Sequence, residues 1–283
     1  MLTKRLFFKT LSPSQERILL SLARYKFLTA GQMLRLGIMT DRANLNKQIS
    51  ELRYWKNPLV GSITFGVNPK FWKLESIHHL SSHGAALIKE RLSPTAPVRF
   101  PKANTVLFAQ DYFHRIHTID THIVIQERAF NHNVELLFFL VYFDKLSTGK
   151  SKGFRSETYI PFWENEYLIA DGICMLQTQN RKELYAIEVF NGMNVQRVHQ
   201  SLLQHLLALK DGQPSKKFEL DYGSRILCVF ELVSCKVQVM KRLCDDEHFA
   251  FAKAYFLFKT LDEVKENVFD GWELFDGTAT TMF

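Results

Sequence analysis

The sequence contains no apolar run long enough to cross a bilayer. Its longest apolar stretch, from Val134 to Phe143, is interrupted by Glu135, whereas a transmembrane helix needs roughly 18 apolar residues. The N-terminus also lacks the extended apolar segment and the A-x-A cleavage site of a signal peptide. These absences predict a cytoplasmic protein without a membrane partner.

Several catalytic and metal-binding signatures are missing as well. The chain has no GxxxxGK[ST] phosphate-binding loop, no GxSxG elbow and no HExxH helix, which argues against an obvious NTPase, serine hydrolase or zinc protease. Its cysteines show no CxxC spacing, a pattern that favours reduced, mostly buried thiols over a structural zinc site. They are Cys174, Cys228, Cys235 and Cys244.

Acidic residues are scarce in the first third of the chain. Residues 1–102 hold 17 Lys and Arg but 5 Asp and Glu, a net charge of +12, while the remainder holds 19 and 24, a net charge of −5. Such a basic segment is typical of a module that binds a polyanion. A merely solvated basic surface is the alternative. A membrane-surface helix fits less well, because the basic residues are spread over several short elements.

Helix-start signals organise this basic part. Ser12-Pro13-Ser14-Gln15 and Thr29-Ala30-Gly31-Gln32 each place a hydroxyl residue three positions before a glutamine, as in a capping box. A third helix is predicted from Thr40 or Asp41 to about Trp55. Three short helices with a tight second turn predict a helix-turn-helix, in which the third helix reads DNA.

A wing is predicted to follow the third helix. A strand-like run at 59–65 leads into turn residues at 66–70 and a returning segment at 71–74, and lysines at such a tip suit phosphate contacts. Residues 81–92 are predicted to close the domain as a helix. The residues expected to contact double-stranded DNA are Arg42, Asn44, Lys47, Gln48, Arg53, Lys70 and Lys73.

Three prolines within residues 93–101 predict a linker at 93–102. It separates a winged helix-turn-helix domain at 1–92 from a second domain at 103–283. The second domain reads as helix, several strands, helix and strand, which is an α/β pattern. Helices are expected at 108–131, 193–210, 247–258 and 261–268, and strands at 135–144, 154–160, 168–176, 184–190 and 225–232.

Two acids of the second domain, Asp171 in LIADGICML and Glu188 in LYAIEVF, stand among apolar residues. Burying an ionised carboxylate without a partner is costly, so such an acid normally has a reason. If residues 177–183 form a hairpin centred between 179 and 180, the two acids lie opposite each other, with Cβ atoms roughly 5 Å apart. Carboxylates at that separation repel unless a cation lies between them, and Mg²⁺ or Mn²⁺ suits such oxygen ligands.

Simpler interpretations of these acids stay open. A one-residue slip in the hairpin would separate them. Asp171-Gly172 could form an ordinary Asp-Gly turn, and Glu188 could pair with Arg197 as a structural ion pair.

The chain resembles the replication-relaxation family, which overlaps the MOB-C class of plasmid relaxases, and its second domain resembles the PD-(D/E)xK nuclease core. Four patterns carry the resemblance: the YKFLTAGQM turn of the winged helix, His114 with Asp120 six residues on, Ser156-Glu157, and IADGICML leading to AIEVFNG. The resemblance implies a winged helix-turn-helix followed by a restriction-endonuclease-like α/β domain. It covers most of residues 12–232.

The resemblance also implies an activity, namely metal-dependent nicking of one DNA strand at a plasmid transfer origin, or binding there. Asp171 and Glu188 would then be ligands for Mg²⁺ or Mn²⁺, and Glu157 would be a third acid near them. The metal of such nucleases activates a water and stabilises charge on the scissile phosphate. His114 would assist as a proton carrier, unless it is only a core helix histidine. Other mobilisation or coupling proteins would be the protein partners.

The chain departs from the nuclease pattern at two positions. Ala170 precedes the aspartate in place of proline, and Phe190 stands where the E-x-K lysine belongs. A cation or amide from the next helix could substitute, with Arg197, Gln204 and Lys210 as candidates. The tyrosines considered for a covalent protein–DNA intermediate are Tyr54, Tyr112, Tyr159 and Tyr167.

Three functions are therefore carried forward. The first is an enzyme of plasmid or mobile-element DNA processing, a relaxase-like endonuclease. The second is a catalytically inactive DNA-binding regulator or accessory factor of plasmid mobilisation or replication. The third is a restriction- or transposition-type endonuclease of the same fold.

Overall fold

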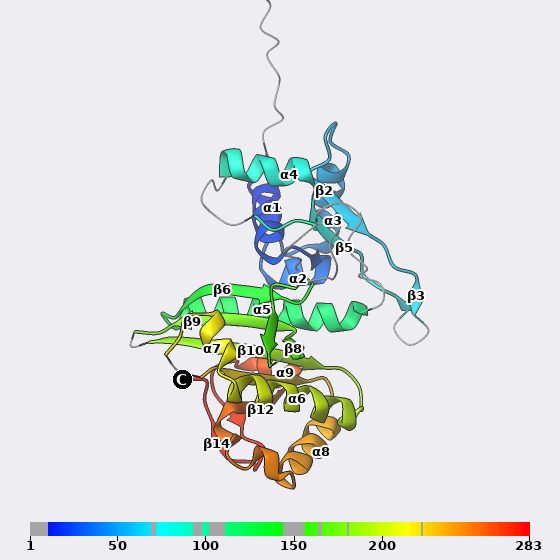
Figure 1. Cartoon of the computed structure of the whole chain (residues 1–283). Coiled ribbons are helices and arrows are strands. Elements are labelled where there is room, and N and C mark those ends of the chain that lie inside the picture. Colours follow the sequence, from blue (N-terminus) through cyan, green and yellow to red (C-terminus); the bar gives the residue numbers. More distant parts are fainter. Residues whose placement is uncertain are drawn as a thin grey trace, which may run out of the picture. The chain divides into compact units, whose positions relative to one another are not determined.

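The computed structural model describes residues 11–68, 72–92, 98–101, 111–143, 156–163, 166–179, 181–221 and 223–283. The chain is a mixed α+β protein of two compact units, Met1–Gln110 and Asp111–Phe283 (Figure 1). The predicted domain start at residue 103 falls within 102–110, outside the described residues. None of the described helices combines the length and the apolar character that a membrane crossing requires.

Unit 1 contains the three helices predicted from the capping signals. They are α1 (Pro13–Tyr25), α2 (Ala30–Arg35) and α3 (Arg42–Arg53). Both capping boxes are present: the Gln15 amide donates to the Ser12 hydroxyl at 3.3 Å, and the Gln32 amide donates to the Thr29 hydroxyl at 3.0 Å. These bonds satisfy amides that a helix leaves without partners in its first turn.

A small antiparallel sheet accompanies these helices in unit 1. It has the order β1-β5-β2, formed by β1 (Leu28–Thr29), β5 (Ile77–Leu80) and β2 (Val60–Ile63). Residues predicted as turn and return form a separate ribbon of β3 (Val67–Asn68) and β4 (Trp72–Lys73). The predicted closing helix is α4 (Ser82–Leu87), which continues into a π-helical turn at Ile88–Leu92. The sequence pattern did not predict β5.

Part of the predicted linker is attached to unit 1. The Arg99 amide donates to the Ala23 carbonyl at 2.9 Å, and its guanidinium donates to the Arg24 carbonyl at 3.4 Å. Residues 98–101 therefore lie alongside the C-terminal end of α1. Residues 93–97 and 102 of the linker lie outside the described residues.

Unit 2 is built on a mixed seven-stranded sheet of order β14-β13-β12-β11-β10-β9-β6. The central strands β10, β11 and β12 are parallel, and the pairs on both sides of them are antiparallel. The bounds are β6 (Glu135–Val141), β9 (Gly172–Gln177), β10 (Lys182–Phe190), β11 (Arg225–Phe230), β12 (Phe256–Thr260), β13 (Trp272–Glu273) and β14 (Ala279–Thr280).

Helices cover both faces of this sheet (Figure 1). The two crossover helices, α6 (Val195–Lys210) and α8 (Val233–Cys244), pack against each other, and one core cluster joins residues such as Leu202 and Val239 to strand residues. On the other side, α5 (Tyr112–Asn131) packs against β6, β10 and α9 (Leu261–Glu266). Parallel strands joined by helices need this covering, because both of their faces are apolar.

Two sequence predictions for unit 2 were wrong. Residues 247–258 do not form a helix: short 3₁₀ turns at Glu247–Phe249 and Lys253–Tyr255 lead into β12, which is buried along its whole length. A short apolar run that is buried on both faces has no alternation to distinguish it from a helix. The predicted strand at 168–176 is split, because it breaks at Ala170 and Asp171 into β8 (Glu166–Ile169) and β9.

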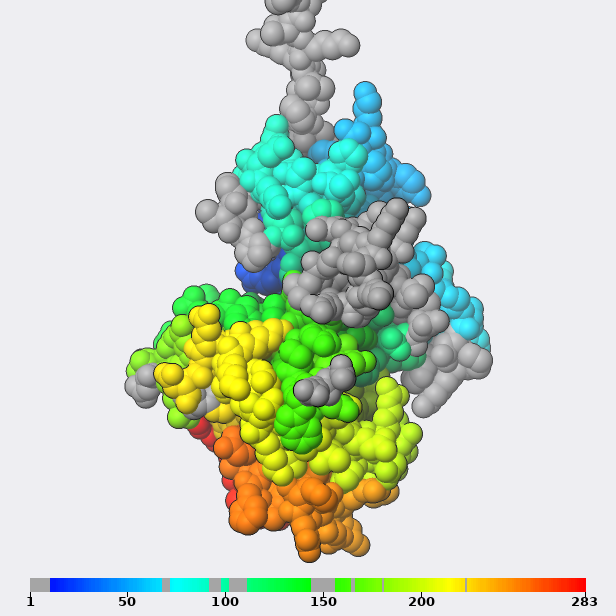
Figure 2. All heavy atoms as spheres, viewed as in Figure 1, coloured from blue at the N-terminus to red at the C-terminus, as the bar shows by residue number. Residues whose placement is uncertain are grey.

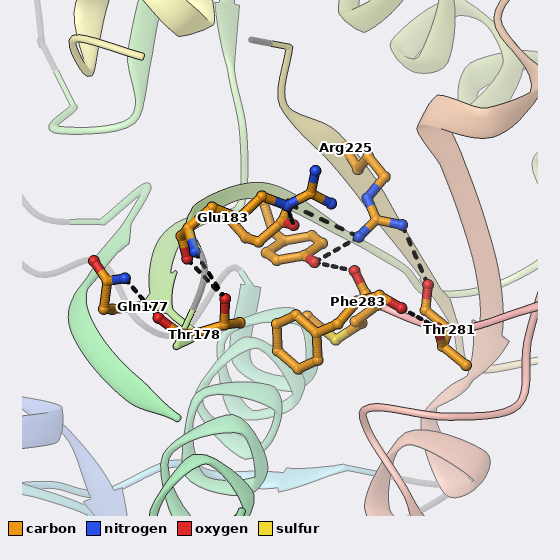
Figure 3. Close-up of polar contacts among 9 residues, drawn as sticks. Gln177, Thr178, Glu183, Arg225, Thr281 and Phe283 are labelled. Atoms are coloured by element: carbon orange, nitrogen blue, oxygen red, sulfur yellow. Dashed lines mark hydrogen bonds and ion pairs between the residues drawn. The ribbon is translucent and has the colours of Figure 1, made fainter. Parts of the chain in front are cut away.

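A polar cluster fixes the beginning of β10 (Figure 3). The Arg225 guanidinium donates to the Tyr185 hydroxyl at 2.7 Å and to the Thr281 carbonyl at 3.2 Å, and Tyr185 in turn donates to the Met282 carbonyl. Glu183, which is buried, pairs with Arg225 at 3.9 Å. These bonds tie residues 281–282 to the sheet, at the end of β10 opposite to Glu188.

Candidate functional site

The two acids singled out in the sequence belong to one hairpin, whose register is the predicted one. Gln177 pairs with Lys182 and Gly172 pairs with Ile187, so every pair of residue numbers adds up to 359. The turn is closed by the Thr178 amide, which donates to the Arg181 carbonyl at 3.0 Å. Asp171 and Glu188 are the next opposed positions, and the predicted register of the hairpin is confirmed.

Asp171 is held by hydrogen bonds on both carboxylate oxygens. Its Oδ1 lies 2.7 Å from Nε2 of His114, and its Oδ2 accepts the Val189 backbone amide at 2.8 Å. The Asp171 carbonyl also accepts the Tyr142 amide at 3.0 Å. The side chain is 13% exposed, so one end of it still reaches solvent.

Glu188 is more deeply buried than Asp171 and contacts a histidine on α6. Its Oε1 lies 2.6 Å from Nε2 of His205, and both side chains are buried. Burial and the charge of Asp171 raise the pKa of Glu188, although His114, the Ser201 hydroxyl and the Asp171 amide act in the opposite direction. Burial lowers the pKa of His205 to about 4. Both shifts favour the uncharged forms of the two side chains.

His114 lies beside this pair and contacts Asp171. Burial alone would lower the pKa of His114, but the charge of Asp171 and the hydrogen bond to it outweigh burial and raise this pKa. The ring also meets Tyr142 edge-on, with centroids 5.4 Å apart, and Arg115 Nε donates to the Tyr142 hydroxyl at 3.2 Å. The first turn of α5 therefore places a histidine, positioned by an aromatic ring, against Asp171, and the contact with Asp171 favours its protonated form.

The structure brings together three of the four predicted catalytic residues, Asp171, Glu188 and His114. The fourth, Glu157, precedes the ribbon formed by β7 (Tyr159–Phe162) and β8, where its charge acts on Lys217 and its carbonyl accepts the Lys217 ammonium at 2.6 Å. The two simple alternatives are not found: Gly172 begins strand β9, and Glu188 contacts His205 in place of Arg197.

None of the three proposed substitutes for the missing lysine faces the acids. Arg197, Gln204 and Lys210 are exposed on the outer side of α6. Ser201 and His205, one turn apart on its inner side, reach Glu188 instead. The sequence did indicate that His205 is buried, because this residue lies three positions after Leu202 on the apolar stripe of the helix.

The same side chains offer few ligands for a metal ion. Within the part of the chain that the structure describes, no group of three or more His, Cys, Asp or Glu side chains is arranged to hold a metal ion. The opposed acids supply two carboxylates. Magnesium commonly binds one or two carboxylates and completes its shell with waters and substrate phosphates, so this donor set fits such an ion better than a closed structural site.

The predicted DNA-contacting residues of unit 1 lie mainly on α3. Arg42, Asn44 and Lys47 are exposed, whereas Gln48 and Arg53 are half-buried. Two of these side chains already have contacts within the unit: Arg42 forms an ion pair with Glu75, and Gln48 accepts the Ser12 hydroxyl at 3.4 Å.

The ribbon of unit 1 presents Lys73 and Trp72 on β4. Both side chains are exposed, and Trp72 is 79% exposed with a backbone φ of +59°. Lys70, predicted at the same tip, lies outside the described residues. A basic and an aromatic side chain therefore stand next to each other on the described part of the ribbon.

Comparisons with known proteins gave no match among protein-family models, curated proteins or solved structures. The function is therefore inferred from the residues and contacts of this chain.

Proposed function

We propose that the chain processes DNA: unit 1 docks on duplex DNA, and unit 2 cuts one strand in a metal-dependent reaction. The observation that carries this proposal is the opposition of Asp171 and Glu188 near the end of β10. Burial and the neighbouring charge of Asp171 raise the pKa of Glu188, and burying a carboxylate in this way costs stability. Such a pair therefore indicates a function that offsets its cost in stability, and cation binding is the function that fits two opposed carboxylates.

The succession of elements around the acids supports a PD-(D/E)xK-like assignment. A strand leads to Asp171, a hairpin follows, the returning strand carries Glu188, and α6 comes next. This is the arrangement on which the resemblance of the sequence rests. The fold-family assignment of unit 2 remains part of the proposal.

Asp171 and Glu188 would hold a divalent cation, Mg²⁺ or Mn²⁺. When bound, such an ion would activate a water and offset charge on the scissile phosphate. His114 takes the place of the missing lysine as the nearby positive charge, and its raised pKa suits a group that donates a proton to a leaving oxygen. His205 and Ser201 orient Glu188 from behind, as outer-shell partners orient ligating carboxylates.

Unit 1 would supply the affinity for DNA. The positive charge of the chain is concentrated in residues 1–102, and α3 presents Arg42, Asn44 and Lys47 to solvent. In a winged helix-turn-helix this helix would enter the major groove, and Lys73 on the ribbon would meet the phosphate backbone. The substrate we propose is a plasmid or mobile-element transfer origin.

One observation favours a second function, that of a DNA-binding regulator without catalysis. Both oxygens of Asp171 are already hydrogen-bonded, and Glu188 is 6% exposed and paired with His205. If these bonds persist in the presence of a metal, unit 2 would serve contacts with other mobilisation proteins. The same fold as a restriction- or transposition-type endonuclease would differ only in its DNA target.

A nicking assay separates these functions. A supercoiled plasmid carrying the transfer origin of the same element is incubated with the wild type and with Glu188→Gln, in Mg²⁺, in Mn²⁺ and in EDTA. We expect the wild type to relax the plasmid only with metal, and Glu188→Gln to leave it supercoiled while still binding it. Arg197→Ala, on the exposed side of α6, is the matched control and should nick normally. Binding by the wild type without nicking in either metal would establish the regulator.

A further inference from the structure

A two-stranded ribbon stands apart from the main sheet of unit 2. It consists of β7 (Tyr159–Phe162) and β8, with Tyr159 paired to Ile169 and Pro161 paired to Tyr167. Side chains alternate between the two faces of a strand. The inner face carries Ile160, Phe162 and Leu168, which are buried in the core shared with α6.

The outer face of the ribbon is aromatic. The Tyr159 and Tyr167 rings stack with centroids 5.2 Å apart and an interplanar angle of 28°. Tyr167 is 50% exposed, and Trp163, which follows β7, is 57% exposed. The inner face already accounts for the packing of the ribbon, so the outer aromatic rings contribute little to the core. Flat exposed rings of this kind provide stacking surfaces for bases.

Lysines lie beside these rings. The Lys217 ammonium donates to the carbonyl oxygens of Glu157 and Tyr159 at 2.6 and 2.9 Å, and this brings α7 (Gln213–Lys217) against β7. Lys216 is exposed on the same helix; its ammonium donates to the Asp211 carbonyl at 3.4 Å, and the Asp211 carboxylate accepts the Trp163 amide at 3.4 Å. Figure 2 shows the green surface of the ribbon next to the yellow surface of α7. Positive charge beside exposed aromatic rings is complementary to a phosphate backbone with splayed bases.

The ribbon also leads directly to the carboxylates. Strand β8 ends at Ile169, and Asp171 follows two residues later. Two residues span at most about 7 Å. Tyr167 stands four residues before Asp171, so a strand of DNA stacked on it would lie within about 14 Å of Asp171 along the chain.

We propose that the outer face of the β7–β8 ribbon, formed by Tyr159 and Tyr167, stacks with the bases of single-stranded DNA. This inference rests on the proposed DNA-processing function and adds to it a substrate class: the strand presented to Asp171 and Glu188 is unpaired. The partner is identified by its flat bases and its regular negative charge, the two properties that the ribbon and its lysines match.

The test is single-strand binding by the full chain in EDTA, measured by fluorescence anisotropy with a labelled 20-nucleotide single strand and, separately, a 20-base-pair duplex. Tyr167→Ala should weaken single-strand binding about tenfold and leave duplex binding within twofold of the wild type. Tyr167→Phe, which keeps the ring, should bind the single strand as tightly as the wild type. Phe251→Ala is the matched control, because Phe251 is an exposed aromatic elsewhere in unit 2.

Tyr167→Ala that binds single strands as tightly as the wild type would overturn the stacking surface, and so would an equal loss in Phe251→Ala. Absence of single-strand binding by the wild type would also overturn it. Because EDTA prevents any metal-dependent cutting, a failure of the nicking assay leaves this measurement interpretable, and a wild type that nicks the plasmid without binding single strands would overturn the stacking surface alone.

Discussion

His205 and Glu188 form a buried hydrogen bond of 2.6 Å between α6 and β10. The two residues are 17 positions apart and approach because α6 crosses over β10 on its way to β11. Each side chain would be costly to bury alone, and each removes part of the other's cost. The contact thus links the crossover helix to the acid that we propose as a metal ligand.

His205→Leu should destabilise unit 2. The substitution leaves a buried carboxyl group without its partner, and we expect the free energy of unfolding to fall by about 1–3 kcal/mol. Urea unfolding of the full chain would measure the loss. Gln204→Leu changes the exposed neighbour on the same helix and should stay within about 0.5 kcal/mol of the wild type. Equal losses in the two variants would contradict a specific bond between His205 and Glu188.

Glu75→Gln should strengthen binding to duplex DNA. In the wild type, the Glu75 carboxylate pairs with Arg42 of α3 and competes with phosphate for that guanidinium. Removing its charge should raise the affinity two- to threefold. One additional phosphate contact would steepen the dependence of log K on log salt by about 0.9. Anisotropy titrations of a duplex at several salt concentrations test both expectations. Weaker binding by Glu75→Gln would show that the pair positions Arg42 for DNA.

Unit 1 should become less stable in mild acid because of His78. Burial, the charge of Arg53 and the neighbouring His79 lower the pKa of His78 from 6.5 to about 4. In the unfolded chain the imidazole binds its proton near pH 6.5, whereas in the folded chain it stays neutral beside Ser62 Oγ, 2.6 Å away. Its contribution to stability is therefore complete above pH 6.5 and declines as the pH falls towards 4, by about 3 kcal/mol at most.

Amide hydrogen exchange in β5 of the full chain, corrected for intrinsic rates, would measure this pH dependence. His78→Gln keeps a polar side chain near Ser62 but does not titrate, so its β5 protection should vary less between pH 7.5 and pH 5. A wild type and a variant with the same pH profile would rule out His78 as the responsible group.

The sequence predicted those parts of the fold that depend on local signals. Ser12 and Thr29 mark helix starts because each cap is a short-range hydrogen bond. The hairpin register followed from one symmetric turn. Strand β12 was missed because a strand buried on both faces has no alternating pattern, and its parallel partner β11 lies more than 20 residues away in the chain.

Prediction of the site was likewise restricted to contacts that depend on local signals in the sequence. Asp171 and Glu188 could be paired from the sequence, because a single hairpin connects them. His205 could not be assigned to Glu188, since its approach depends on how α6 crosses the sheet. The role expected for Glu157 also required knowledge of tertiary structure, and the structure places its carbonyl against Lys217 instead.

The position of the turn between β9 and β10 determines that the two carboxylates lie opposite each other. Thr178 and Arg181 close the turn, and the same number of residues separates each of them from its acid. Adding a single residue to one strand would turn its acid to the opposite face of the sheet, while an equal addition to both would keep the acids opposed and move them together away from the turn. The chain can therefore change the surface of this hairpin by substitution, but an insertion or deletion in one strand alone separates the pair.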